Sequence, residues 1–314
     1  MKKEIVAGIE YSRPEVFLFQ ETGIGVAEFA ARTAYDSFEN SENEVVKNLK
    51  HLVDKTLIIT ADENTSEMIK RNTIKDVNDI EESALLDQLA WVHHHHSVIE
   101  HSVLSFYIKG TSRGVLQEHA RHRIQSITVR STRYTMSDIV NAFITAISVF
   151  EDECEAYQWF EEKLLELDIF VTTDVDYNKL QINDIYDKMM FQLNRMIETH
   201  DDGLLEFNKM CLSKENLEYI AHVGPEDSPN SVYINLKTGK KKRNVGDPFK
   251  HIVNDNWKVD MVITFNLRSL KNYFDLRDSG AAYFQIKWLA EEMKKVIPEK
   301  YLKLIIKEYR NKDK

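Results

Sequence analysis

Cysteine is nearly absent from this sequence. The 314 residues include only Cys154 and Cys211, and the two are far from any CxxC spacing. A disulfide framework needs several cysteines, and a cysteine-ligated zinc site needs them at short intervals. The sequence therefore lacks the pattern of a disulfide-stabilised secreted domain, and a reducing, cytoplasmic location is expected.

Long apolar runs and an excess of positive charge are missing as well. No stretch of about 18 apolar residues occurs, so no membrane span is expected, and the start MKKEIVAGIEYSRPE lacks the apolar core of a signal peptide. The chain has 41 Lys+Arg against 51 Asp+Glu, a net charge of −10. This acidity argues against general binding to nucleic acid or to anionic membranes. Any basic cluster should therefore serve a small, specific anion.

Glycine and proline are scarce too, with ten and five residues respectively. Few turn-forming residues favour long helices over a β fold with many turns. We therefore expect a helix-rich α/β protein of the α+β type with a small mixed or antiparallel sheet. We expect a single domain over residues 1–314, with an insertion or hairpin at about 223–248. No GxGxxG motif is present, so a Rossmann fold is not predicted.

The spacing of apolar residues predicts individual elements. Helices are expected at 27–38, 42–53, 83–94, 112–123, 153–167, 182–198, 267–277 and 281–296. Strands are expected at 103–110 and 259–265, an extended segment at 126–135, and a hairpin within 232–245 that turns at Lys237-Thr238-Gly239. The KKKR run that follows this turn reads as a solvated segment.

Four arginines and a histidine gather in the stretch RHRIQSITVRSTRY, residues 121–134. Arginine binds phosphate and carboxylate through a planar fork of donors and stays charged at physiological pH. In an extended segment Ser131 and Arg133 would share one face, which suits a phosphate. The RHR triplet would end the preceding helix and face a second ligand. The alternative is a solvated basic face, partly favoured by the dipole at the helix C-terminus.

These residues resemble a known family. Arg121-His122-Arg123 is followed by seven residues and Ser131, a pattern similar to the signature of the flavin-dependent thymidylate synthases, and the similarity extends to Ser126, Arg133 and Tyr134. Upstream, HSVIEHSVLSFYIKG (96–110) resembles the histidine-bearing loop and strand of that family. Downstream, FNLRSLKNYFDLRDSGAAYFQI (265–286) resembles its flavin-contacting segment. The three blocks occur in the family's order.

The resemblance implies a reductive methylation of dUMP to dTMP, the thymidylate synthase step of nucleotide biosynthesis. FAD would carry a hydride from NADPH to the uracil ring, and methylenetetrahydrofolate would supply only the one-carbon unit. The enzyme would be a methyltransferase and flavoprotein, a homotetramer with active sites between subunits. It would need no metal and bind neither nucleic acid nor a membrane.

The resemblance also assigns site residues. The cofactor-binding positions are Ser97, Arg121, His122, Arg123, Asn266, Arg268 and Asn272. The substrate-binding positions are Glu118, Arg121, Arg130, Ser131, Thr132, Arg133, Lys250 and Arg277. Ser131 is assigned to binding instead of nucleophilic attack, because no base adjoins it. Lys250 stands where the family has a phosphate-binding arginine, and keeps the charge without the bidentate fork.

Arg277 is the proposed catalytic residue, contacting the uracil and easing ionisation at N3, because a cation lowers the cost of a developing anion. Arg268 and Asn272 are four residues apart and share a helix face. Arg277 lies five residues further on, about 140° around the helix, and should face another part of the cavity. Its alternative role is a plain charge at the end of a helix.

Two departures from the family pattern keep other functions open. Thr128-Val129 replaces the usual Asn-Glu, and Glu118 replaces a Gln. Glu118 would turn away, pair with Arg121 or Arg133, or indicate a different substrate. One alternative is therefore a flavin-dependent methylase or hydroxymethylase of another pyrimidine nucleotide such as dCMP. Another is a non-enzymatic nucleotide- or RNA-binding protein. The four histidines 93–96 do not predict a metal site, because adjacent side chains fan out around a helix.

Overall fold

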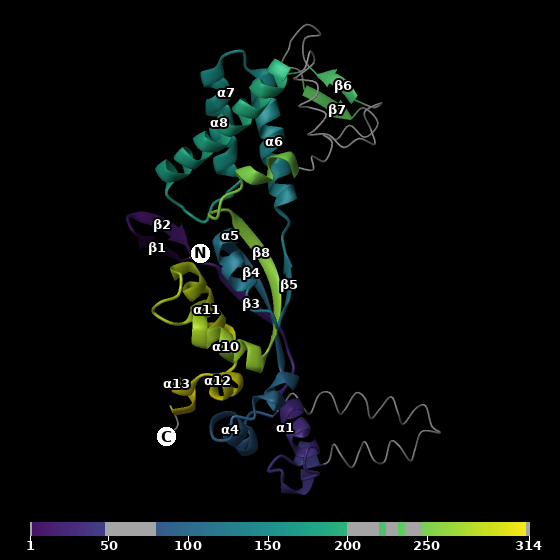
Figure 1. Ribbon diagram of the computed structural model, residues 1–314. Helices are drawn as coiled ribbons and strands as arrows, with labels where there is room; N and C mark the ends of the chain where they lie inside the picture. Colours follow the sequence, from purple (N-terminus) through teal and green to yellow (C-terminus); the bar gives the residue numbers. More distant parts are fainter. Residues whose placement is uncertain (1, 48–79, 200–219, 224–231, 236–246, 312–314) are drawn as a thin grey trace, which may run out of the picture. The chain divides into compact units, whose positions relative to one another are not determined.

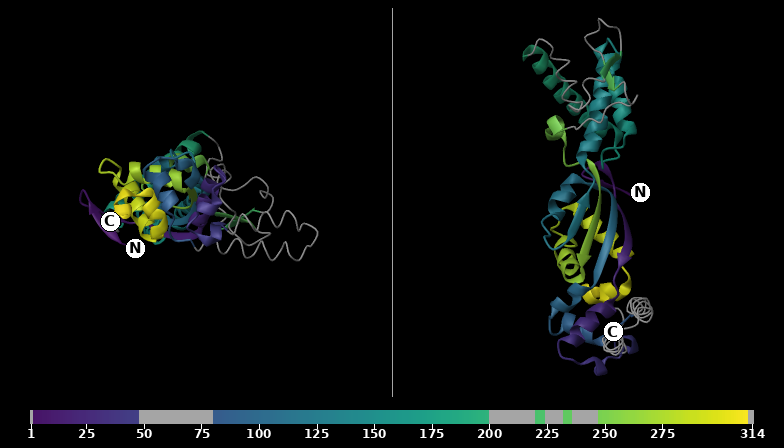
Figure 2. Two further views of the ribbon diagram at one scale, coloured as in Figure 1. Left: turned by 90° about the horizontal axis from the view of Figure 1, so that it is seen from below. Right: turned by 90° about the vertical axis from the view of Figure 1, so that its right-hand side faces the viewer.

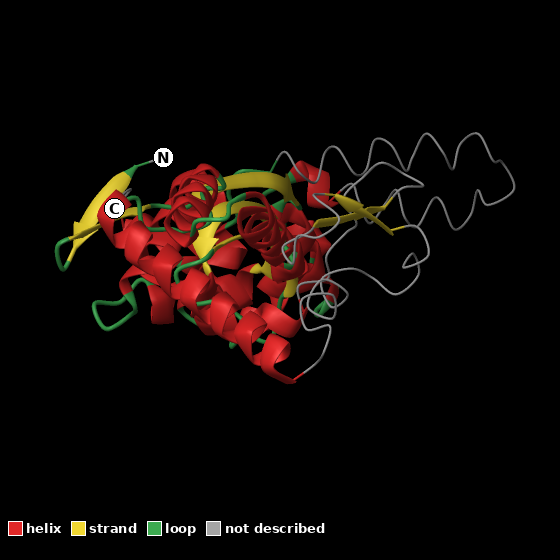
Figure 3. Ribbon diagram, turned by 90° about the horizontal axis from the view of Figure 1, so that it is seen from above, coloured by secondary structure: helices red, strands yellow, loops and turns green. Residues whose placement is uncertain are grey.

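The computed structural model describes residues 2–47, 80–199, 220–223, 232–235 and 247–311. The chain divides into two compact units. Unit 1 comprises Met1–Arg13, Gly110–Val115 and Val129–Val259, and unit 2 comprises Pro14–Lys109, Leu116–Thr128 and Asp260–Lys314. Helices outnumber strands among the described elements (Figure 3), which confirms the expected helix-rich α+β class.

Unit 2 is built on a four-stranded sheet in the order β3-β4-β8-β5 (Figure 1). The terminal residues of β4, β5 and β8 fall within the residue ranges of unit 1. The strands of the sheet are β3 (Glu15–Glu21), β4 (Val103–Ser112), β8 (Lys258–Asn266) and β5 (Ser126–Val129). β3 and β4 are antiparallel, with Phe17 opposite Tyr107. Alternate residues of β4 and β8, including Phe106 and Phe265, are fully buried, so the sheet has one face in the core.

Helices cover that buried face. Unit 2 contains α1 (Ile24–Thr33), η1 (Phe38–Asn40), α4 (Ala84–Trp91), η2 (His96–His101), the last turn of α5 (Arg113–His119), α10 (Leu267–Arg277), α11 (Phe284–Val296), α12 (Glu299–Ile305) and α13 (Lys307–Arg310). α11 packs against β3, and α10 packs against α11 and α12. In the right-hand view of Figure 2 the strands face the viewer and α10 and α11 lie behind them.

Unit 1 has a helical core. Its main helices are α6 (Thr132–Val149), α7 (Glu153–Glu166) and α8 (Val175–Thr199), with the short helix η4 (Asp247–Ile252). Two antiparallel pairs complete it, β1 (Lys3–Val6) with β2 (Ile9–Ser12) and β6 (Ile220–Val223) with β7 (Val232–Asn235). Phe143, Phe160 and Tyr186, one from each long helix, meet with ring centroids 5.3–6.1 Å apart. These aromatic contacts hold the three helices together.

The strands at 103–110 and 259–265 and the helix at 267–277 are confirmed. The helices at 83–94, 153–167, 182–198 and 281–296 are confirmed as well, with ends shifted by up to seven residues. The helix expected at 27–38 begins and ends earlier, as α1. Of the helix expected at 42–53, residues 42–47 are described, and 44–47 are helical. The strand at 232–235 is present and pairs with β6. The turn at Lys237-Thr238-Gly239 and the KKKR run lie outside the described residues, so the insertion at 223–248 stays a prediction.

The predicted helix 112–123 is too long. It begins as expected, because the Ser112 Oγ accepts the Val115 N–H at 3.1 Å. It ends at His119, whose carbonyl accepts the side-chain amide of Gln125 at 3.0 Å. This bond satisfies a terminal carbonyl of the helix. The RHR triplet therefore lies in the loop after α5.

The extended segment predicted over 126–135 is wrong beyond Val129. β5 ends there and α6 begins at Thr132. Met136, Ile139, Val140 and Phe143 are all fully buried, and their spacing forms one helix face. Packing of this face outweighs the local preference of β-branched residues for a strand.

Candidate active site

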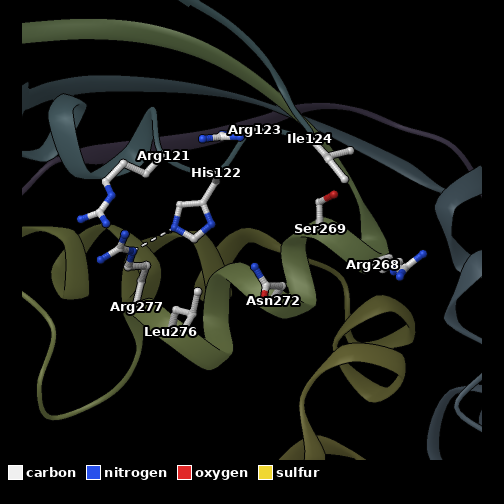
Figure 4. Close-up of a pocket in the computed structure, with 9 residues that line it drawn as sticks. All are labelled: Arg121, His122, Arg123, Ile124, Arg268, Ser269, Asn272, Leu276 and Arg277. Atoms are coloured by element: carbon white, nitrogen blue, oxygen red, sulfur yellow. Dashed lines mark hydrogen bonds between the residues drawn. The ribbon is translucent and has the colours of Figure 1, made fainter.

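A cavity of about 780 Å³ opens in unit 2 between two segments that are distant in the sequence (Figure 4). Arg121, His122, Arg123 and Ile124 of the loop after α5 line one wall, and Arg268, Ser269, Asn272, Leu276 and Arg277 of α10 line the other. Its volume lies in the range of small-molecule and cofactor sites.

The loop wall rests on a buried histidine. His119 is fully buried, and its ring lies 5.2 Å from that of Tyr273 and 5.6 Å from that of Phe265. Its Nε2 has no hydrogen-bond partner. Burial lowers the pKa of His119 to about 4, so this imidazole is neutral at pH 7. The neutral His119 ring, packed against Tyr273 and Phe265, thus fixes the start of the RHR loop, the loop after α5 that carries Arg121, His122 and Arg123.

A side-chain cap fixes the start of α10, the helix that forms the other wall. The Asn266 Oδ1 accepts the backbone N–H of Ser269 at 2.8 Å, which starts α10 immediately after β8. Asn266 thereby positions the helix and does not itself line the cavity. Ser269, Asn272 and Leu276 follow at spacings of three and four residues, so they share the face that meets the cavity.

Arg277 lies at one end of the cavity and Arg268 at the other (Figure 4). Arg277 is held by three hydrogen bonds. Its Nη1 donates to the Glu118 carboxylate at 2.6 Å, its Nη2 to the Glu118 carbonyl at 3.2 Å, and its Nε to the His122 Nε2 at 2.9 Å. Glu118 therefore pairs with Arg277, a partner that the sequence alternatives did not name.

The bond from Arg277 determines the protonation of His122. Because the arginine Nε–H is a donor, the His122 Nε2 must accept and carries no proton. Burial first, and then the charge of Arg277, lower the pKa of His122, while the Glu118 carboxylate raises it. His122 is thus neutral at pH 7 with its proton on Nδ1. In Figure 4 this second ring nitrogen faces the side of the cavity where Asn272 lies.

Arg268 forms the second ion pair of the cavity. Its Nη1 donates to the Glu100 carboxylate of η2, and η2 packs against α10. Ser97, a predicted flavin contact, is an exposed residue of the same short helix and does not line the cavity. Four guanidinium groups, Arg121, Arg123, Arg268 and Arg277, thus border the cavity, with carboxylates paired to two of them. The excess of positive charge suits an anionic ligand.

The remaining predicted substrate residues belong to unit 1. Arg130 and Ser131 directly precede α6, and Thr132 and Arg133 are its first two residues. Lys250 is exposed in η4, which packs against α6. The expectation that Ser131 and Arg133 share a strand face is wrong, because Arg133 is helical. The four residues 130–133 instead lie at a helix N-terminus, where the helix dipole favours anions.

The sequence profile of the family described as thymidylate synthase complementing protein matches residues 18–301. The chain belongs to this family. Its curated relatives include flavin-dependent thymidylate synthases of Wolinella succinogenes, 23% identical over 91% of this chain and 94% of the relative, and of Campylobacter jejuni, 25% identical over 73% and 81%.

A solved family structure shares the fold. The flavin-dependent thymidylate synthase of Helicobacter pylori, crystallised with FAD and dUMP, aligns with a TM-score of 0.50 at 22% identity. The alignment covers 93% of this chain and 98% of that one. The predicted family and fold class are therefore confirmed, including the absence of a Rossmann arrangement.

Three residues of the cavity were not predicted from the sequence. These are Ile124, Ser269 and Leu276. Ser269 and Leu276 lie three residues before and four residues after Asn272, so helical periodicity alone places them on its face. Ile124 has no such pattern, because it lies in a loop whose course depends on the bond between Gln125 and the end of α5.

None of the four histidines 93–96 lines this cavity. His93 and His95 have ring centroids 6.0 Å apart, and the His96 Nε2 lies 2.9 Å from the Ala90 carbonyl. Within the described part of the chain, no group of three or more His, Cys, Asp or Glu side chains is arranged to hold a metal. No helix there is both long and apolar enough to span a bilayer.

Proposed function

We propose that this chain methylates dUMP to dTMP, using FAD reduced by NADPH and methylenetetrahydrofolate as the one-carbon donor. The observation that carries the proposal is the cavity bordered by four arginines of two distant segments, in a chain of this family. A guanidinium fork matches a phosphate oxygen pair. Such a cavity suits a ligand with several phosphates and a planar polar ring.

The residues present fit FAD. Arg121, Arg123 and Arg268 supply cations for a pyrophosphate, and His122 and Asn272 supply hydrogen bonds for the edge of an isoalloxazine. The full proposed cofactor set is Ser97, Arg121, His122, Arg123, Asn266, Arg268 and Asn272, in which Asn266 acts through its cap. When bound, the flavin supplies the hydride chemistry that no side chain can. The protein residues bind and orient it.

Arg277 is the proposed catalytic residue for the nucleotide. Three of its five N–H groups are engaged, which leaves two to contact the uracil. A fixed cation there stabilises negative charge that develops on the ring when N3 ionises. The other proposed substrate residues are Glu118, Arg121, Arg130, Ser131, Thr132, Arg133 and Lys250, with the N-terminus of α6 favouring the phosphate.

Assembly into a homotetramer is part of the proposal. Phe17 and Val262 lie on the sheet face opposite the helices and are 50% and 38% exposed. Phe17 stacks on Tyr107 at 6.1 Å. Aromatic and aliphatic side chains on an open sheet face favour contact with another subunit. Such an assembly would bring residues of several copies to one site, as the resemblance implies.

Glu118 favours one second candidate. Its carboxylate contacts Arg277, which lines the cavity. A carboxylate can accept a hydrogen bond from the amino group of cytosine, a group that uracil lacks. A methylase or hydroxymethylase acting on dCMP therefore stays open.

The visible absorption spectrum of the purified protein, followed by turnover of dUMP and of dCMP, tests the proposal. We expect a yellow protein that is bleached by NADPH and that forms dTMP when methylenetetrahydrofolate is added. Turnover of dCMP alone would transfer the proposal to the second candidate. A colourless protein that takes up no FAD and turns over neither nucleotide would instead leave a nucleotide- or RNA-binding protein.

Replacement of Arg133 by alanine tests the unit 1 residues. We expect dUMP binding to weaken by about ten- to a hundred-fold, since a charge-assisted hydrogen bond contributes about 1.5–3 kcal/mol. FAD affinity should change little. Isothermal titration of each ligand gives both values, and Arg195→Ala in the exposed pair with Glu198 is the control. Loss of FAD with unchanged dUMP affinity would mean that the two ligands are assigned the wrong way round.

A further inference from the structure

Glu118 holds Arg277 through two different atoms. The carboxylate accepts from Nη1 and the backbone carbonyl of the same residue accepts from Nη2. Arg277 lines the cavity, and its side chain is 16% exposed, whereas that of Glu118, which contacts it, is 34% exposed. Two acceptors on one rigid helix fix the plane of the guanidinium.

The fixed guanidinium then determines the state of His122. Its Nε–H points at the His122 Nε2 from 2.9 Å. A protonated His122 would place two N–H donors face to face, so this contact exists only with the neutral ring. The His122 ring also packs against two other rings, with its centroid 4.8 Å from that of Tyr273 and 6.4 Å from that of His119. The His122 Nδ1–H is therefore the hydrogen-bond donor that this ring can offer to a ligand in the cavity.

We propose that Glu118 is a positioning residue that keeps Arg277 against His122 and so maintains a neutral His122 with an Nδ1–H donor for the ligand. The partner on the ligand is a hydrogen-bond acceptor, such as a ring carbonyl or ring nitrogen. Only the identity of that ligand, the flavin, rests on the proposed function. The state of His122 belongs to the protein alone.

The charged and titratable groups that face His122 determine in which direction its protonation should shift. These are Arg277 from α10, Glu118 and His119 from α5, and the adjacent Arg121. The negative charge of Glu118 favours the protonated imidazole, and the positive charge of Arg277 disfavours it. Removing the Glu118 charge while Arg277 stays in place should therefore make His122 harder to protonate.

Two substitutions of Glu118 separate the hydrogen bond that positions Arg277 from the negative charge of the carboxylate. Glu118→Gln keeps an oxygen for the Arg277 Nη1 and removes the charge, whereas Glu118→Ala removes both. The matched control is Glu100→Gln, which makes the same change in the ion pair with Arg268 at the other end of the cavity. Each full-length, flavin-free protein is labelled with ¹³C-histidine, and the His122 resonance is assigned by its absence in His122→Gln.

The imidazole carbon shifts report both tautomer and titration. We expect the Nδ1–H tautomer in the wild type and in Glu118→Gln, with titration moved to lower pH in Glu118→Gln and unmoved in Glu100→Gln. In Glu118→Ala we expect a mixture of tautomers. FAD affinity should fall about ten-fold in Glu118→Ala and less than about three-fold in Glu118→Gln, as fits the loss or retention of a hydrogen bond to a charged group.

Two results would overturn the proposal. One is an Nε2–H tautomer in the wild type, and the other is an identical His122 titration in the wild type and both Glu118 variants. If the proposed function is wrong and the role of Glu118 is right, His122 shows the expected tautomer and titration, but the protein takes up no FAD. If Glu118→Ala does not fold, Glu118→Gln and Glu100→Gln still decide the question, because both retain the shape of the cavity wall.

Discussion

Replacement of Arg277 by alanine should lower the rate of dTMP formation by up to about a thousand-fold, the cost of losing one preorganised donor at a developing anion. The guanidinium is already oriented by Glu118 and His122 before any substrate arrives, so little reorganisation accompanies the reaction. Single-turnover kinetics with pre-reduced flavin measures the chemical step directly and separates it from NADPH oxidation.

Replacement of Arg277 should also weaken substrate binding, and a double variant separates this effect from the effect on the rate. Removing Arg277 leaves the Glu118 carboxylate unpaired beside an anionic substrate, which weakens binding by repulsion. The double variant Arg277→Ala with Glu118→Gln removes that repulsion. We expect it to recover dUMP affinity and not the rate. Full recovery of the rate would show that Arg277 only neutralises Glu118, and Arg195→Ala should be without effect.

The sequence predicts the helix wall of the cavity well. Apolar residues at 267, 270, 273 and 274 give α10 its buried face, and the polar residues between them must face the other way. The ends of α10 are also local, because Asn266 is a strong N-cap residue. Each of these features depends on neighbours within one or two turns, which a sequence displays directly.

The loop wall and the start of α6 depend on distant contacts. The helix α5 stops at His119 because Gln125 folds back onto its carbonyl and because Phe265 and Tyr273 enclose the ring. Thr132 and Arg133 join α6 because its following turns pack on α7 and place Phe143 against Tyr186 of α8. The pair between Glu118 and Arg277 joins residues 159 positions apart. No local pattern contains such partners, and propensity alone favoured a longer helix and a longer strand.

A loss of about 3 kcal/mol of stability between pH 7 and pH 4 is expected from His119 alone. Its pKa is about 4 in the folded protein because the ring is buried, against about 6.5 in an unfolded chain. The unfolded state therefore binds the proton more readily, so the stabilisation is complete above pH 6.5 and is lost as the pH falls towards 4. Burial is the largest cause of this low pKa, and it outweighs the Gln125 side chain, which raises the pKa.

His119→Phe removes the titrating group and keeps an aromatic ring between Phe265 and Tyr273. Urea unfolding of the wild type and the variant at intervals from pH 7 to pH 4 gives the free energy of unfolding of each. The carboxylates titrate in both proteins, so the difference between the two pH profiles belongs to His119. We expect the variant's profile to be flatter by about 3 kcal/mol over this range.

The control is His101→Phe, which removes an exposed imidazole that contacts water whether the chain is folded or not. It shows how far the exchange of an imidazole for a phenyl ring at an exposed position alters the profile by itself. Parallel profiles for the wild type and His119→Phe would mean that water or a moving side chain reaches the His119 Nε2, and that the support beneath the RHR loop opens in solution. The loop that carries Arg121 and His122 would then be ordered by its ligand instead of by the buried ring.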